Sequence, residues 1–108
     1  MTANLLADLP PAADDELFTD ILTRPGVRIE RIVSHGQVTP LDRPYVQAHE
    51  EWVLLLAGAA RVAMAGSEIA LHPGDHLFIP AGAEHRVTFT DPTRPTVWLA
   101  IHIGEAVG

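Results

Sequence analysis

The stretch Gly74-Asp-His-Leu-Phe-Ile-Pro80-Ala-Gly82-Ala-Glu-His85-Arg-Val87 decides the fold predicted for this chain. Gly74 permits a turn with positive φ, and the apolar residues that follow it predict a short strand. Pro80 ends that strand, since proline cannot donate to a sheet. Gly82 then allows a sharp reversal, so that His85 starts the next strand. Two short strands joined by a tight connection, with a histidine at its exit, are therefore expected here.

The composition narrows the class of protein. The chain has 108 residues, 14 acidic side chains and 7 arginines without a lysine, which gives a formal charge of −7. This balance argues against nucleic acid or an anionic membrane as partner. No apolar run approaches a membrane span, and Met1–Asp15 lacks the pattern of a signal peptide, so we expect a cytoplasmic protein. Without cysteine, any metal must be held by nitrogen and oxygen, and six histidines are present.

Short apolar runs alternate with turn signals from Leu17 onward, which predicts an all-β domain of about nine strands with hardly any helix. A sandwich or small barrel would hide the sheet edges. Residues 1–16 are predicted to form an N-terminal arm and residues 17–108 a single domain. The expected strands are Leu17–Leu22, Val27–Val33, Tyr45–His49, Trp52–Ala57, Ala59–Ala65, Ser67–Leu71, His76–Ile79, Arg86–Thr90 and Thr96–Ile103.

The stretch from Gly74 to His85 resembles the second conserved motif of the cupin superfamily: Gly, five residues, Pro, one residue, Gly, two residues, His. All four typed positions match, whereas the family's further Asn is replaced by Phe89. The first motif is His, one residue, His, three or four residues, Glu, six residues, Gly. Aligned on Glu51 and Gly58, it places Gln47 and Tyr45 at the two histidine positions. The resemblance spans about residues 27–103 and implies a jelly-roll β-barrel.

The resemblance also implies one divalent metal ion inside the barrel, held by Gln47, Glu51 and His85. An imidazole, a carboxylate and an amide oxygen form a mixed donor set, which leaves Zn, Mn, Fe and Ni open. Tyr45 is a poor ligand because its ordinary pKa is about 10. We expect it to hydrogen-bond a substrate or a metal-bound water. The alternatives are a purely structural His85, a solvated Glu51 and a Gln47 bonded to backbone.

Two further histidines are candidate replacements for the missing pair. His49 shares a face with Glu51 if the strand stays extended. In the last strand, His102 alternates with Trp98 and Ala100 on one face, opposite Val97, Leu99, Ile101 and Ile103. We assign His102, His49 and Tyr45 as candidate catalytic groups, with a structural role for either histidine left open. His35, His72 and His76 are expected in loops and turns, and both tryptophans in the core.

Two functions remain open. The first is a metal-dependent enzyme of oxygenase, isomerase or lyase type, acting on a small organic molecule with His49 or His102 transferring protons. The second is a non-catalytic protein that binds or senses a small ligand, with a weakened or absent metal site. The change of the histidine pair to Tyr45 and Gln47 favours the second. The edge strands expected for a small barrel, with residues 1–22 across a partner's sheet, predict a homodimer.

Overall fold

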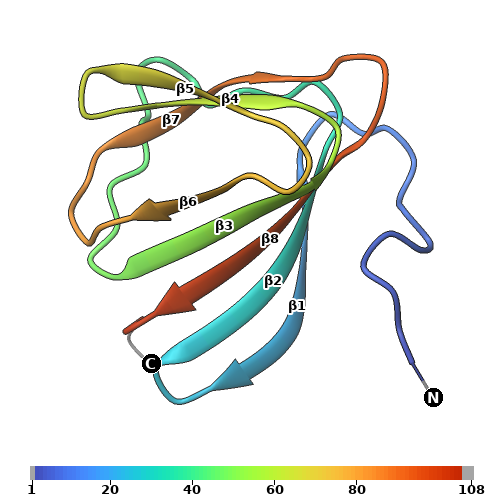
Figure 1. Cartoon of the computed structure of the whole chain (residues 1–108), viewed down its shortest axis with the longest axis horizontal. Coiled ribbons are helices and arrows are strands. Elements are labelled where there is room, and N and C mark those ends of the chain that lie inside the picture. Colours follow the sequence, from blue (N-terminus) through green and yellow to red (C-terminus); the bar gives the residue numbers. More distant parts are fainter. Residues whose placement is uncertain (1, 106–108) are drawn as a thin grey trace.

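The computed structural model describes residues 2–105, which form eight strands and, within that range, no helix. No helix long and apolar enough to cross a membrane therefore occurs in the described part of the chain. The strands, shown in Figure 1, are β1 (Leu17–Arg24), β2 (Val27–Ser34), β3 (Glu50–Ala57), β4 (Ala60–Met64), β5 (Ser67–Leu71), β6 (His76–Ile79), β7 (His85–Thr90) and β8 (Thr96–Ile103).

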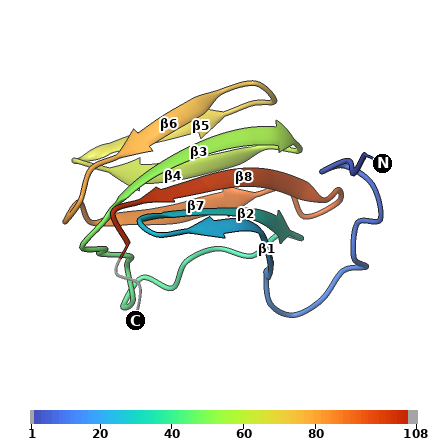
Figure 2. The ribbon, with the colours of Figure 1, turned by 90° about the horizontal axis from the view of Figure 1, so that it is seen from below.

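The strands form two antiparallel sheets that lie face to face (Figures 1 and 2). The larger sheet has the order β1-β2-β8-β3-β6, and the smaller has the order β5-β4-β7. The residues before β1 form no strand. Their backbone is tied to β2, because Arg31 donates to the carbonyls of Leu5 and Ala7 at 3.2 and 3.1 Å. The all-β prediction is confirmed.

Alternation along β8 fixes which side chains face the small sheet. Trp98, Ala100 and His102 are all buried, as the period of two predicts. Their neighbours Leu99 and Ile101 are only half-buried on the opposite face. The core therefore lies between the two sheets and consists mainly of Val53, Leu55, Ala60, Val62, Leu71, Ile79, Trp98 and Ala100.

The two tryptophans differ, and the expectation that Trp52 anchors the core is wrong. In β3, the buried positions are Glu51, Val53 and Leu55, so Trp52 points out of the opposite face. There it is half-buried against the ring of His76, with the two centroids 5.4 Å apart. The apolar run that contains Trp52 conceals the alternation, because both faces of β3 carry large apolar side chains.

Gly58 joins the two sheets and tolerates no side chain. Its φ is +86°, and a Cβ atom there would lie 2.6 Å from the Cα atom of Thr96 and 2.9 Å from the carbonyl oxygen of Pro95. Since both are backbone atoms, the start of β8 would have to move. The glycine that closes the first motif is therefore required where β3 turns into β4.

The predicted strand Tyr45–His49 is wrong. Only Tyr45 pairs, in an isolated bridge with His85, whose N–H and carbonyl lie 3.0 and 2.9 Å from their partners on Tyr45. Gly82 also donates to the carbonyl of Gln47 at 2.6 Å. Tyr45 thus contacts the small sheet, while Glu50 already pairs with β8 in the large sheet. The chain crosses between sheets over these residues, so no continuous ladder forms.

Candidate metal centre

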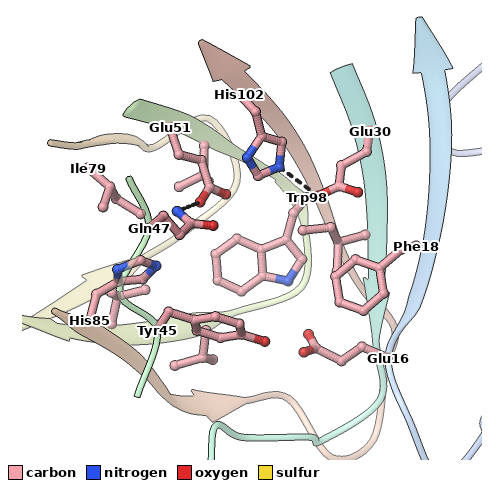
Figure 3. A pocket seen from close by; sticks show the side chains of 14 residues that line it. Glu16, Phe18, Glu30, Tyr45, Gln47, Glu51, Ile79, His85, Trp98 and His102 are labelled. Carbon is pink, nitrogen blue, oxygen red and sulfur yellow. Dashed lines mark hydrogen bonds and ion pairs between the residues drawn. The ribbon is translucent and has the colours of Figure 1, made fainter. Parts of the chain in front are cut away.

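A cavity of about 120 Å³ lies between the sheets. Figure 3 shows its lining residues. Its apolar side includes Phe18, Val53, Ile79 and Trp98 from the larger sheet and Val62 and Val87 from the smaller one. Its polar lining residues are Glu16, Glu30, Tyr45, Gln47, Glu51, His85 and His102. The fold thus brings five of the six predicted site residues to one cavity, and the sixth, His49, contacts His102.

His85 begins β7 and is 6% exposed. Its Nδ1 atom lies 3.0 Å from the carbonyl oxygen of Ala83. Because a carbonyl can only accept, Nδ1 carries a hydrogen, and in the neutral ring the lone pair therefore lies on Nε2. Metal-bound histidines are held by the same arrangement, in which the second ring nitrogen donates to a backbone carbonyl. His85 therefore has the form that a ligand requires.

Gln47 and Glu51 lie beside His85 (Figure 3). The amide Nε2 atom of Gln47 donates to Glu51 Oε1 at 2.9 Å. This hydrogen bond uses the amide nitrogen, so the amide oxygen of Gln47 is the atom that could bind an ion. Glu51 comes from β3 and is 7% exposed. One imidazole nitrogen and two side-chain oxygens suit a divalent ion, although the amide is a weaker donor than a second imidazole.

Tyr45 covers His85 from one side. The two rings are stacked, with centroids 5.5 Å apart and planes 22° apart. Burial, followed by the carboxylate of Glu16 and then that of Glu51, raises the pKa of Tyr45 above its ordinary value. The phenol therefore stays protonated at neutral pH and serves as a hydrogen-bond donor rather than as a metal ligand.

A second group of polar residues, here called the charge network, adjoins the cavity and consists of Arg28, Glu30, His49, His102 and Glu105. His102 Nε2 lies 2.8 Å from Glu30 Oε1, and its Nδ1 lies 2.8 Å from His49 Nε2. Arg28 contacts Glu30 at 2.7 Å and holds both oxygens of Glu105, at 2.7 and 2.9 Å. Every member is thus bonded to at least one other member.

The charges of this network stabilise one another. Burial alone would raise the pKa of Glu30, but the His102 hydrogen bond and the Arg28 charge outweigh it, so that the pKa lies below 4.5. Burial likewise opposes the charged form of His102, yet Glu30 and Glu51 raise its pKa above 6.5. The hydrogen bond from Arg28 lowers the pKa of Glu105 to about 2. The network therefore favours ionised carboxylates and a protonated His102.

A third carboxylate enters the cavity from the residues before β1. Glu16 accepts a hydrogen bond from the hydroxyl of Ser34, which in turn accepts one from Trp98 Nε1 at 3.1 Å. Burial raises the pKa of Glu16, and the bond from Ser34 opposes this. Three of the residues that line the cavity are therefore acidic. The lining contains no arginine or lysine.

Sequence reasoning missed Glu16, Arg28, Glu30 and Glu105. The sequence held a signal for two of them, because Arg28 and Glu30 fall on the same face of β2 as Ile32. These three residues pair with the inward-facing His102, Ala100 and Trp98 of β8. The remaining histidines, His35, His72 and His76, do not line the cavity. His72 lies in a turn, where its N–H donates to Asp75 at 2.8 Å.

Comparison with known proteins identifies the family. The model of the cupin domain matches residues 30–102, and the chain is therefore a member of the cupin family. Among curated proteins, none matches it. A putative mannose-6-phosphate isomerase from Ralstonia eutropha is 42% identical, with a TM-score of 0.92 over 97% of this chain and 99% of that one.

A cupin superfamily protein from Desulfitobacterium hafniense has the same fold at lower identity. It is 19% identical, with a TM-score of 0.78 over 96% of this chain and 92% of the other. At that identity the likeness establishes the fold alone. Together with the family match, it supports a jelly-roll arrangement of the two sheets.

Proposed function

We propose that this cupin binds one divalent metal ion through Gln47, Glu51 and His85, inside a closed jelly-roll barrel. The observation that carries the proposal is the hydrogen bond from His85 Nδ1 to the carbonyl of Ala83, which leaves Nε2 with its lone pair. Glu51 supplies the negative charge, and the amide oxygen of Gln47 completes a three-ligand set. Three protein ligands leave coordination positions open for a substrate or water.

The cavity selects its ligand by size and charge. It is small, at about 120 Å³, and its lining holds three carboxylates and two histidines without an arginine or lysine. The three carboxylates repel a phosphate group, so we propose that the substrate is not a sugar phosphate of the kind named for the Ralstonia relative. A small uncharged or cationic organic molecule suits this lining, with the apolar side of Trp98 and Phe18 covering its hydrocarbon part.

For the chemistry, we propose a metal-dependent enzyme of oxygenase, isomerase or lyase type. The bound ion would act as a Lewis acid on an oxygen of the substrate. His102 holds a proton at the wall of the cavity and contacts His49, so that the pair provides a route for proton transfer away from the cavity. Tyr45 donates a hydrogen bond that orients the substrate or a water molecule.

A non-catalytic binding protein is the second candidate. The hydrogen bond between Gln47 and Glu51 favours it, because these side chains satisfy each other without an ion. In that case the cavity would bind the same small molecule without turnover.

Metal analysis of untagged protein tests the metal site. We expect His85→Gln to bind about one ion per chain fewer than the wild type. His72→Gln is the matched control, because that imidazole is exposed in a turn. Wild-type protein that takes up no ion from a titration of Zn²⁺, Mn²⁺, Fe²⁺ or Ni²⁺ would overturn the proposal. Turnover of small carbonyl compounds, or of oxygen with them, then separates an enzyme from a binding protein.

We also propose that the chain forms a homodimer through β1. This strand is the edge of the larger sheet, and all eight of its residues are exposed, including Phe18 and Ile21. An unpaired apolar edge is a template for a second copy. Sedimentation equilibrium should show a dimer that Ile21→Lys converts to a monomer. Leu41→Lys, in an exposed loop, should leave the dimer intact. A monomeric wild type would contradict this proposal.

A further inference from the structure

Three metal-ligating atoms meet outside the proposed Gln47–Glu51–His85 site. One nitrogen each of His49 and His102 and one oxygen of Glu105 all lie within 4.8 Å of one another. The two nitrogens are 2.8 Å apart, and His49 Nε2 is 3.8 Å from Glu105 Oε2. Two imidazoles and one carboxylate form a donor set typical of sites for first-row transition metals.

We propose that His49, His102 and Glu105 form a second divalent-metal site, separate from the first. An ion bound there displaces the proton between the two histidines, so the pair transfers protons only while this second site is empty. The cupin motif resemblance did not place metal ligands at these three positions. The proposal stands whether or not the first site binds an ion, because the two sets have no ligand in common.

The residues around the three ligands already hold two of them in a binding orientation. Glu30 accepts from His102 Nε2, so that in the neutral ring the lone pair lies on Nδ1, the atom that faces His49. A carboxylate behind a histidine is the usual support of such a ligand. Arg28 in turn fixes the carboxylate of Glu105 through two hydrogen bonds.

The local charge also suits a divalent ion. Glu30 and Glu105 belong to the charge network, and the single guanidinium of Arg28 stands against these two carboxylates. With both imidazoles neutral, the surplus is one negative charge, which attracts a cation. When the first site is empty, Glu51, which lies opposite His102 in the register of β3 and β8, adds a second negative charge. Burial of Glu30 and His102 strengthens this attraction by lowering the local dielectric.

The two sites differ in the metal they prefer. The first set offers one imidazole and two oxygens, whereas the second offers two imidazoles and one oxygen. Imidazole nitrogens favour Zn²⁺, Ni²⁺ and Cu²⁺, while oxygen donors favour Mg²⁺, Ca²⁺ and Mn²⁺. The second site should therefore bind Cu²⁺ and Zn²⁺ more tightly than the first site does.

Counting nitrogens on bound Cu²⁺ tests the assignment. Untagged, metal-free protein is loaded with one equivalent of Cu²⁺, and pulsed electron paramagnetic resonance counts the coupled imidazoles. We expect two imidazoles in the wild type and one in His49→Gln, with at least about a 100-fold loss of affinity for Zn²⁺ by calorimetry. His72→Gln is the control and should match the wild type.

His85→Gln separates this proposal from the first. Loss of affinity in His49→Gln but not in His85→Gln supports the second site and contradicts the first. The reverse pattern overturns the second site, and so does a single ion lost equally in both variants. One ion lost in each, from two in the wild type, supports both sites. Absence of binding in the wild type overturns both. If His49→Gln fails to fold, Glu105→Gln removes the third ligand and tests the same site.

Discussion

The two polar clusters of this cupin sit side by side and are built differently. The motif cluster, Gln47, Glu51 and His85, occupies the positions that the family motif marks. Within residues 2–105, two hydrogen bonds hold its side chains. The charge network occupies positions outside the two motifs or not typed by them, and its members are bonded to one another through Arg28 and His102. The first motif lacks its two histidines, and Glu30 from β2 and His102 from β8 supply other polar groups to the same cavity.

This difference suits the motif cluster to ligand binding and the charge network to the stability of the fold. A sparsely bonded cluster can exchange its partners for a ligand at little cost, because few interactions are broken. A buried ionic network resists change, since the removal of one member leaves its partners buried and unpaired. Substitutions in the network should therefore affect folding first, and substitutions in the motif cluster should affect ligands first.

The largest expected effect is that of Arg28→Met. It leaves the buried carboxylate of Glu30 without its guanidinium partner, and we expect the free energy of unfolding to fall by about 3 kcal/mol. Urea unfolding followed by tryptophan fluorescence measures this. Arg43→Met is the control: its ion pair with Asp42 is 3.9 Å long and exposed, so the change should stay within about 0.5 kcal/mol. Equal losses of unfolding free energy in both variants would contradict the importance of the charge network for stability.

The pH dependence of stability should come mainly from the network. Glu30 and Glu105 have lowered pKa values, so they stabilise the fold above pH 4.5, and this contribution is lost as the pH falls through their folded pKa values (about 2 for Glu105). His102 has a raised pKa, so its contribution is complete below pH 6.5 and is lost as the pH rises through its folded value.

Metal-free protein should therefore be most stable between about pH 4.5 and 6.5. Thermal melting across pH 3 to 9 in the presence of a chelator measures this. Arg28→Met should flatten the acidic side of the profile, because Glu105 then titrates near its ordinary value. A wild-type profile that rises steadily to pH 9 would contradict the part assigned to His102.

In the motif cluster, Gln47→His restores one of the family's two histidines. A second imidazole should tighten Zn²⁺ binding about tenfold, or about 1.4 kcal/mol, by calorimetry. The variant is best made in the His49→Gln background, so that only the first site is measured. Unchanged affinity would show that position 47 does not face the ion.

The smallest effect is expected for Gln47→Met. It removes one hydrogen bond to Glu51, so the free energy of unfolding should fall by about 1 kcal/mol or less. Chemical denaturation of metal-free protein gives the value. A loss as large as that of Arg28→Met would mean that the motif cluster is as important for folding as the network.

Local patterns predicted the parts of the fold that depend on local chemistry. The turn at Gly74 and the position of His85 follow from backbone rules, and the inward face of β8 follows from strict alternation. Alternation along β2 is consistent with an inward Glu30, but its hydrogen bond to His102 could not be predicted, because the two residues are 72 positions apart in the chain. The strand predicted at Tyr45–His49 failed for a related reason: its pairing changes from one sheet to the other.

The bridge between Tyr45 and His85 also has a consequence for kinetics. Three backbone hydrogen bonds tie Tyr45 and Gln47 to the turn that carries Gly82 and His85. Tyr45, Gln47 and His85 line the cavity, so a ligand that enters past them must break these hydrogen bonds together. The amide hydrogens of Tyr45, Gly82 and His85 should then exchange with solvent as one unit. The rate of that opening sets an upper limit on how fast this route admits a ligand.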